Sequence, residues 1–476
     1  MGSLAQRRTI PGLVLPAVAG VATLCFAVAA SLCFAAVASA QDFAPGAAGV
    51  GDPYFPKSGN GGYDVQHYDL ELGYAPRRFR LDAVATITAT ATHGLSRFNL
   101  DYRGPKLRAL TVDGQPAATS RAGQELIVTP PAPIAAGQQF EVVVSYAGQV
   151  GPLTDGDGSI SGWIPTGDGA FVAGEPRGAP TWFPCNDHPT DKATYETTIT
   201  VPAGRTALAN GILTNQTTSA GRTTFTWRED NPMATYLATA TSGRFGLEQA
   251  SVGDIPSYIA VDPREAKQSR RALAKLPQIL AFLESSFGDY PFASTGAIVD
   301  HAPFVGYALE TQTLPLFGSA PDEPILVHEL AHQWFGDSLT PARWEDIWLN
   351  EGFATWSEWL WTDHKGAKTL ERTFKDLYEV PARNREFWGP PPGAPGGPRH
   401  LFDASVYVRG AMTLEALREK IGDSSFLLIL RRWTAEHRYG NVSTPEFIAL
   451  AEQESGQQLD AFFRVWLYQR DKPKDW

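Results

Sequence analysis

The spacing of apolar and polar positions divides the chain into a strand-rich part and a helix-rich part. From Tyr68 onwards apolar and polar residues alternate, and residues 85–92 place alanine and isoleucine on one face and threonine on the other. Further short β-prone runs cover 140–146, 195–201, 225–227 and 236–240. Alternation with period two between Gly, Pro and Asp turns is typical of antiparallel strands with one buried face. The pattern predicts an antiparallel β domain that reaches about residue 250, after a Gly/Pro-rich stretch at 41–64 that we expect to be loose.

After residue 250 the period changes to that of helices. A strand-like run at 258–261 precedes Asp262-Pro263, which can begin a helix, and apolar residues then recur at helical spacing from Leu273 to Leu283. Further helices are predicted near 324–335, 351–362, 367–379, 406–421, 424–436, 444–454 and 458–469. The Gly/Pro-rich run 389–398 cannot be helical, and we predict a mobile surface loop there.

The first forty residues differ from the rest of the chain. Arg7 and Arg8 precede an apolar, Ala-rich run that ends at Ala38-Ser39-Ala40, which is the layout of a secretory signal peptide. We expect cleavage near Ala40 and a secreted or cell-envelope-associated product without stable membrane insertion. An uncleaved membrane anchor is the alternative, because the run is long enough to span a bilayer. The arginine pair raises a twin-arginine route, but the Thr-Ile-Pro that follows fits that signal poorly. The predicted organisation is a signal peptide at 1–40, a β domain at 41–250 and a catalytic domain at 251–476.

Composition narrows the class of protein. The 476 residues are 43% hydrophobic and 19% charged, which supplies apolar material for large cores and excludes a disordered chain. The formal net charge is −11 without blocks of Lys or Arg, so we expect no nucleic-acid partner. Only one of the three cysteines, Cys185, follows the predicted leader, so we expect no internal disulfide and a buried structural thiol. The sequence gives no indication of the oligomeric state.

The strongest chemical signal is His328-Glu329-Leu330-Ala331-His332. On a helix the two histidines lie one turn apart on the same face, so both imidazoles can reach one metal ion with Glu329 beside them. Glu351 opens the next predicted helix and can return to the metal as the third ligand. Two imidazoles, one carboxylate and an open position make a catalytic zinc site, although cobalt or manganese suits the same donors. Taken singly, the motif also fits a surface helix, and Glu351 also fits a carboxylate favoured by the helix dipole.

Together these residues resemble the gluzincin metallo-aminopeptidases of the aminopeptidase N and leukotriene hydrolase type. Four other places are similar to motifs of that family. They are Gly306-Tyr307-Ala308-Leu309-Glu310-Thr311 (Gly-x-Met-Glu-Asn in the family), Phe183-Pro184-Cys185-Asn186-Asp187-His188-Pro189 (Phe-Pro-Cys-x-Asp-Glu-Pro), Glu175 at a Glu/Gln position, and Tyr407-Val408-Arg409-Gly410 (Tyr-x-Lys-Gly). The resemblance covers about residues 65–470. It implies a multidomain α+β fold, with a saddle-like antiparallel β domain before a thermolysin-like, mainly helical catalytic domain.

The resemblance also implies a role for each matched residue at the metal. His328, His332 and Glu351 would bind one zinc ion per chain. Glu329 would be the general base towards the water that the metal activates, since zinc brings the pKa of such a water towards about 7.

The remaining matched residues would act on the substrate. Tyr407 would donate a hydrogen bond to the developing oxyanion. Glu310 and Glu175 would hold the free α-ammonium group of a peptide, which needs anionic partners once it loses its hydration. The implied activity is a secreted zinc aminopeptidase that acts on peptides with a free N-terminus.

The departures from the family leave alternatives open. Leu309 and Thr311 replace the Met and Asn of the family motif, which puts the preferred side chain in doubt, and His188 replaces a Glu. Family members commonly continue with further domains that roof the site, so we expect two domains and a more open cleft here. The rival functions are a zinc endopeptidase, an epoxide hydrolase of the leukotriene hydrolase type, and a binding module that keeps only the fold.

Overall fold

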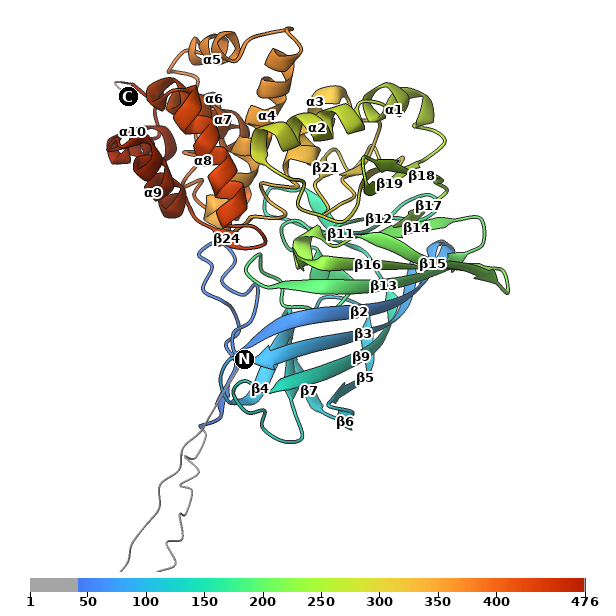
Figure 1. The fold of residues 1–476 in the computed structure, drawn as a ribbon. Coiled ribbons are helices and arrows are strands. Elements are labelled where there is room, and N and C mark those ends of the chain that lie inside the picture. Colours follow the sequence, from blue (N-terminus) through green and yellow to red (C-terminus); the bar gives the residue numbers. More distant parts are fainter. Residues whose placement is uncertain (1–41, 475) are drawn as a thin grey trace, which may run out of the picture. The chain divides into compact units, whose positions relative to one another are not determined.

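An eight-stranded sheet forms the centre of the β domain in the computed structural model, which describes residues 42–474 and 476 (Figure 1). In spatial order its strands are β15 (Ile212–Ser219), β16 (Arg222–Ala234), β13 (Lys192–Pro202), β2 (Tyr63–Ala75), β3 (Arg80–Ala91), β9 (Gln139–Gln149), β5 (Lys106–Val112) and β6 (Gln115–Pro116). The predicted alternation is confirmed: Leu70 and Ile87 are buried, whereas Thr86 and Thr88 are half-exposed on the other face. One neighbouring pair, β13 with β2, is parallel, which the long connection between these two strands permits.

Two smaller sheets complete the β domain. One has the order β1 (Ala44–Pro45), β4 (Leu95–Asp101), β8 (Glu125–Thr129) and β7 (Ala118–Ala122). The other has the order β10 (Pro152–Thr154), β11 (Ile160–Pro165), β12 (Ala170–Ala173), β17 (Ala240–Gly243) and β14 (Thr206–Ala209). The strand predicted at 236–240 is wrong in its first part, because Thr235–Leu237 form a 3-10 turn and β17 begins only at Ala240.

A five-stranded sheet and ten helices make up the part of the chain after the β domain (Figure 1). The sheet has the order β18 (Gly246–Val252), β19 (Ile255–Val261), β20 (Thr295–Val299), β22 (Leu316–Phe317) and β21 (Ala308–Leu309). The helices are α1 (Ala266–Leu273), α2 (Leu276–Phe287), α3 (Glu323–Ala331), α4 (Trp348–His364), α5 (Leu370–Tyr378), α6 (Arg385–Trp388), α7 (Ala404–Ile421), α8 (Asp423–Glu436), α9 (Thr444–Ser455) and α10 (Asp460–Phe463). A parallel pair, β23 (Thr340–Pro341) with β24 (Asn441–Val442), joins two connections of this part. The predicted helices are confirmed except the last, which is split into α10 and a π-helical turn at Arg464–Tyr468.

The stretch before β2 is not loose, contrary to the sequence prediction. Asp52, Phe55, Ser58 and Asn60 in it are buried. The backbone N–H of Gly59 and the Asn60 side chain both donate to the carboxylate of Asp101, at 3.0 and 3.1 Å. Hydrogen bonds to distant strands therefore fix a segment that has no apolar periodicity of its own.

The Gly/Pro-rich run 389–398 contains no α-helix, and a 3-10 turn begins only at its last residue, Pro398, but the run is not simply a surface loop. Pro391, Pro392 and Gly393 are buried, and the Gly393 N–H donates to the Leu467 carbonyl at 2.9 Å. The tail of the chain therefore packs over this run.

Three other expectations concern single features of the chain. Cys185 is a buried free thiol, as predicted. The predicted signal peptide at 1–40 and its cleavage site lie outside the described residues. Within the described part of the chain, every helix is too short or too polar to cross a membrane.

Candidate metal and peptide site

Helix α3 carries the two histidines of the motif. Asp322 caps its first turn by accepting a hydrogen bond from the Ile325 N–H at 3.0 Å, and Pro324 occupies the first turn, where its missing N–H costs nothing. His332 follows the last α-helical residue, and its N–H still donates to the His328 carbonyl at 3.2 Å. One helical turn therefore separates the two imidazole rings, whose centroids are 4.7 Å apart.

Helix α4 brings Glu351 to these two rings. The Oε2 atom of Glu351 lies 3.1 Å from His328 Nε2 and 3.3 Å from His332 Nε2. All three side chains are buried or nearly so, and their donor atoms converge within 4.8 Å of one another. The positive charge and hydrogen bonds of the protonated imidazoles lower the pKa of Glu351 to about 2, against the effect of burial, so its carboxylate stays ionised. This donor set fits a zinc ion.

The outward-facing nitrogens of both histidines are fixed by oxygen acceptors. His328 Nδ1 lies 2.7 Å from Glu358 Oε1, and His332 Nδ1 lies 2.9 Å from the Phe335 carbonyl. Since both acceptors are oxygens, each Nδ1 carries a proton, and Nε2 is the nitrogen that would bind a metal once its own proton leaves. Glu358 is not among the site residues predicted from the sequence. The signal that could have found it is its position two turns after Glu351, on the same face of α4.

Glu329 and Tyr407 lie beside the metal ligands. A carboxylate oxygen of Glu329 is within 4.8 Å of donor atoms of Glu310 and His332. Burial raises the pKa of Glu329 to about 8, although the two imidazoles oppose that rise. The Tyr407 ring, on α7, stacks on the His328 ring with centroids 6.0 Å apart and planes 21° apart.

Two further carboxylates, Glu310 and Glu175, face the same space. Glu310 follows β21, and Glu175 follows β12 of the β domain. The Oε1 atom of each is buried and has no hydrogen-bond partner among the described residues. Burial raises the pKa of both side chains, and the negative charge of Glu310 raises that of Glu175 further. Unpartnered buried carboxylates of this kind are expected where a cationic ligand binds.

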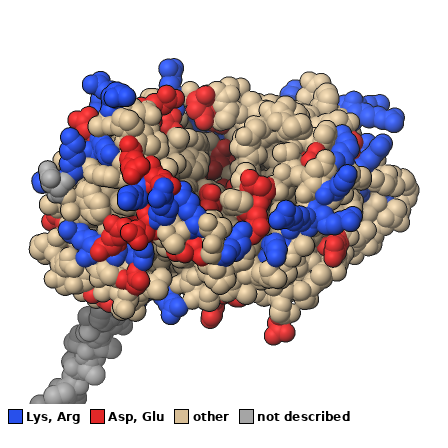
Figure 2. Space-filling view, turned by 90° about the horizontal axis from the view of Figure 1, so that it is seen from above, with Lys and Arg blue, Asp and Glu red and all other residues tan. Residues whose placement is uncertain are grey.

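All seven residues selected from the sequence line one cavity of about 430 Å³. They are Glu175, Glu310, His328, Glu329, His332, Glu351 and Tyr407. The face of the molecule seen in Figure 2 is hollowed near its centre, and acidic side chains lie in the hollow. Leu309 and Thr311, the two departures from the family motif, are buried and do not line the cavity. His188, the third departure, is buried against Asp52 and Thr190 rather than in the cavity.

Comparisons with known proteins agree with this arrangement. Residues 64–237 match the Peptidase M1 N-terminal domain and residues 321–466 match the Peptidase family M1 domain. An M1 zinc metallopeptidase from Deinococcus radiodurans has a similar structure, with a TM-score of 0.82 and 33% identity over 90% of this chain and 99% of that one. A mutant M1 zinc metallopeptidase from the same organism, with the same TM-score and identity, was solved with a Tyr-Ser-Ala substrate bound.

Similar sequences carry aminopeptidase names. The chain is 26% identical to the alanine/arginine aminopeptidase of Saccharomyces cerevisiae over 60% of its own length, and 28% identical to aminopeptidase M1 of Arabidopsis thaliana over 63%. The matches cover 36% of each of these relatives, so the chain spans about a third of their length.

The fold and the donor set define the class as a two-domain zinc metallopeptidase. Within that class, the chain belongs to peptidase family M1, with the aminopeptidase N-like arrangement of a β domain before a helical catalytic domain.

Proposed function

We propose that the protein is a zinc-dependent aminopeptidase that binds one zinc ion per chain and removes the first residue of peptides. The observation that carries this proposal is the pair of buried, unpartnered carboxylate oxygens of Glu310 and Glu175 in the same cavity as the metal ligands. A peptide α-ammonium supplies the positive charge and the three donors that these oxygens lack.

The zinc ligands in this proposal are His328, His332 and Glu351. When bound, zinc acts as a Lewis acid that polarises the scissile carbonyl and makes a water molecule nucleophilic at neutral pH. Glu358 and the Phe335 carbonyl keep the proton of each imidazole on Nδ1, so that Nε2 faces the metal.

The other side chains divide the work of proton transfer and charge stabilisation. Glu329 takes the proton of the attacking water and passes it to the leaving amine, since it is the carboxylate beside the ligand His332 that is not itself a ligand or an ammonium partner. Tyr407 donates its hydroxyl hydrogen to the oxyanion that develops at the carbonyl. Its ring stacks on the His328 ring, and Tyr407 lines the cavity together with the metal ligands.

The two ammonium partners explain why the enzyme would act at the end of a chain rather than inside it. An acylated N-terminus would place an uncharged amide against two buried carboxylates and leave them unpaired. In an endopeptidase the bound peptide would have no free ammonium group at this position, so Glu310 and Glu175 would have no cationic partner.

The test is hydrolysis of one fluorogenic peptide in two forms, with a free amine and with an acetylated amine. The proposal predicts hydrolysis of the free-amine form only, lost on chelation and restored by zinc. The Glu329→Gln variant, which keeps the metal ligands, is the control and should lose most turnover. Cleavage of both forms at an internal bond would overturn the aminopeptidase assignment and leave the metal site intact.

We also propose that the chain is exported and cleaved near Ala40. The support is the charge, length and small-residue layout of the first forty residues. N-terminal sequencing of the protein recovered from the producing cells should read Gln41-Asp42-Phe43. Recovery of the intact leader in the membrane fraction would favour the anchor instead.

A further inference from the structure

The segment that follows α3, residues 335–338, is held by two side chains of the β domain. Lys192, at the start of β13, donates three hydrogen bonds. Its Nζ donates to the carbonyl oxygens of Asp337 at 3.1 Å, Ser338 at 2.9 Å and Gly440 at 3.0 Å. An ammonium group has three hydrogens, so this contact leaves none unpaired. Lys192 therefore ties two separate connections of the catalytic domain to one strand of the β domain.

The second side chain is Tyr236, in the 3-10 turn that takes the place of the first part of the predicted strand. Its buried hydroxyl donates to the Gly336 carbonyl at 2.6 Å. Three consecutive carbonyls, those of Gly336, Asp337 and Ser338, thus accept hydrogen bonds from the β domain. The carbonyl just before them, that of Phe335, accepts the hydrogen bond that orients the ligand His332.

The segment also makes local backbone hydrogen bonds, since the N–H groups of Phe335, Asp337 and Ser338 donate to the carbonyls of Ala331, His332 and Gln333 at 3.2, 3.0 and 3.2 Å. Gly336 has a φ of 130°, which side-chain-bearing residues rarely adopt, and a Cβ there would lie 3.2 Å from His332 Nδ1. A glycine gives the segment its turn but also the freedom to leave it. The local bonds engage the N–H groups of the segment, whereas Lys192 and Tyr236 bind the carbonyl oxygens of residues 336–338 and so add to the hold on the Phe335 carbonyl.

We propose that Lys192 and Tyr236 are positioning residues for the zinc ligand His332, so that the β domain is part of the metal centre. The inference rests on the proposed zinc site. Their hydrogen bonds hold residues 335–338, the segment holds the Phe335 carbonyl, and that carbonyl sets the ring orientation and tautomer of His332. Partners outside the ligand shell change metal affinity by about 10- to 100-fold when they are removed.

The experiment measures zinc affinity, not turnover. Lys192→Met and Tyr236→Phe are compared with the wild-type chain by competition against a chromophoric chelator, and the cobalt-substituted proteins are compared by their visible absorption. We expect each variant to bind zinc about 10-fold more weakly and to show a changed cobalt spectrum, because one imidazole is no longer held.

Matched controls separate this effect from a general loss of stability. Tyr54→Phe removes another tyrosine hydroxyl that contacts the backbone between the two parts of the chain, at the Gly396 N–H, 2.9 Å away. Lys472→Met removes another lysine that donates to backbone carbonyls, those of Tyr378 and Val380. Neither touches residues 335–338, so both should keep wild-type zinc affinity and spectrum.

A charge control is needed as well, because the positive charge of Lys192 favours the ionised form of the buried Asp337 side chain, and Lys192→Met removes that charge. The double variant Lys192→Met/Asp337→Asn removes the Asp337 carboxylate as well, and the inference expects its zinc affinity to stay low. Full recovery in the double variant, or wild-type affinity and spectrum in both single variants, would overturn the inference. Absence of zinc binding by the wild-type chain would instead overturn the proposed function.

Discussion

Glu358 Oε1 lies 2.7 Å from Nδ1 of His328, on the side of the ring opposite to the Nε2 atom that faces Glu351. Helix α4 thus supplies both a metal ligand and the carboxylate that orients another ligand. The spacing of seven residues between Glu351 and Glu358 puts them on one face of the helix, so a single rigid element sets both contacts.

Removal of the Glu358 side chain should therefore weaken metal binding without touching the ligands. We expect Glu358→Ala to lower zinc affinity by about 10- to 100-fold, measured by chelator competition. Glu358→Gln should lose much less, because its amide oxygen still accepts from Nδ1. Equal zinc affinity in the alanine variant and the wild type would show that the contact does not orient His328.

The Tyr407 hydroxyl should matter in the transition state more than in the substrate complex. We expect Tyr407→Phe to lower kcat by about 10²- to 10³-fold, the usual cost of losing one oxyanion donor, with little change in KM. Steady-state kinetics on a free-amine peptide checks this. A raised KM with normal kcat would instead make Tyr407 a ground-state binding residue.

The metal ligands could be predicted from the sequence because their geometry is local. His328 and His332 are one helical turn apart, and Glu351 lies in the first turn of α4, so the period of the α-helix places two donors and the return of the next helix places the third. The β domain could be predicted for the same reason, since alternation along β2 and β3 reports directly which side chains are buried.

Other features depend on contacts between distant parts of the chain. Asp52 accepts from the Trp344 N–H, 292 residues further along, and no periodicity in a Gly/Pro-rich stretch reports such a contact. Tyr236 lies in an alternating run, yet its hydroxyl is used by the catalytic domain and the backbone turns there instead of continuing as a strand. Lys192 lies just before the predicted strand 195–201, and only the assembled structure shows which carbonyls it meets.

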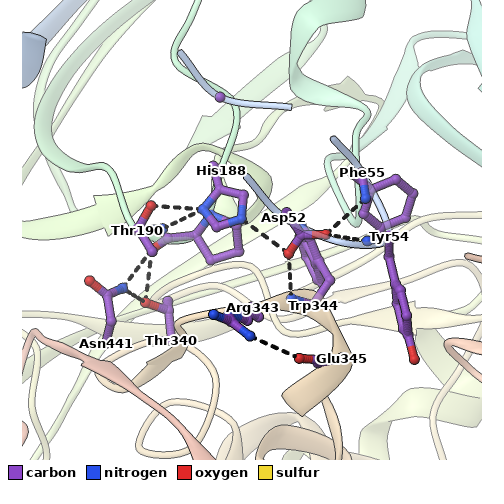
Figure 3. A network of polar contacts seen from close by, with 12 residues as sticks. Asp52, Tyr54, Phe55, His188, Thr190, Thr340, Arg343, Trp344, Glu345 and Asn441 are labelled. Carbon is purple, nitrogen blue, oxygen red and sulfur yellow. Dashed lines mark hydrogen bonds and ion pairs between the residues drawn. The ribbon is translucent and has the colours of Figure 1, made fainter. Parts of the chain in front are cut away.

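The Asp52 contact leads to a prediction on stability (Figure 3). Asp52 accepts from the N–H groups of Tyr54, Phe55 and Trp344 at 2.8, 2.8 and 2.9 Å, and His188 Nε2 lies 3.4 Å away. Burial alone would raise the pKa of Asp52, but the hydrogen bonds from His188, Trp344 and Phe55 outweigh burial and lower it. We expect Asp52→Asn to destabilise the fold by about 1–3 kcal/mol at pH 7, measured by denaturant unfolding.

The pH dependence of that difference follows from the sign of the shift. A carboxylate whose pKa is lowered by folding stabilises the protein above its unfolded pKa, near 3.8, and the contribution is lost as pH falls through the lower folded value. The gap in unfolding free energy between wild type and Asp52→Asn should therefore be constant from pH 7 to about 5 and shrink below about 4. A gap that persists undiminished at acid pH would mean that the carboxylate charge is not what stabilises this junction.

Two glycines set the distance between α4 and α7, and hence between Glu351 and Tyr407. A Cβ on Gly352 would lie 2.9 Å from the Gly410 carbonyl carbon, and a Cβ on Gly410 would lie 3.0 Å from Gly352 Cα. The backbones of α4 and α7 thus touch at one crossing point. Gly352 directly follows Glu351 in the sequence, and Gly410 comes three residues after Tyr407. We expect Gly352→Ala to destabilise the protein by about 1–3 kcal/mol and to lower kcat, because it forces the two helices apart.

The decisive comparison for this helix crossing uses Gly410→Ala and Gly151→Ala. Gly410→Ala should reproduce both losses, since the clash is the same one seen from the other helix. Gly151→Ala should show neither loss, because nothing lies within 4 Å of a Cβ at that position. If Gly352→Ala were less stable but turned over substrate at the wild-type rate, the crossing would serve packing alone and Tyr407 would not depend on it.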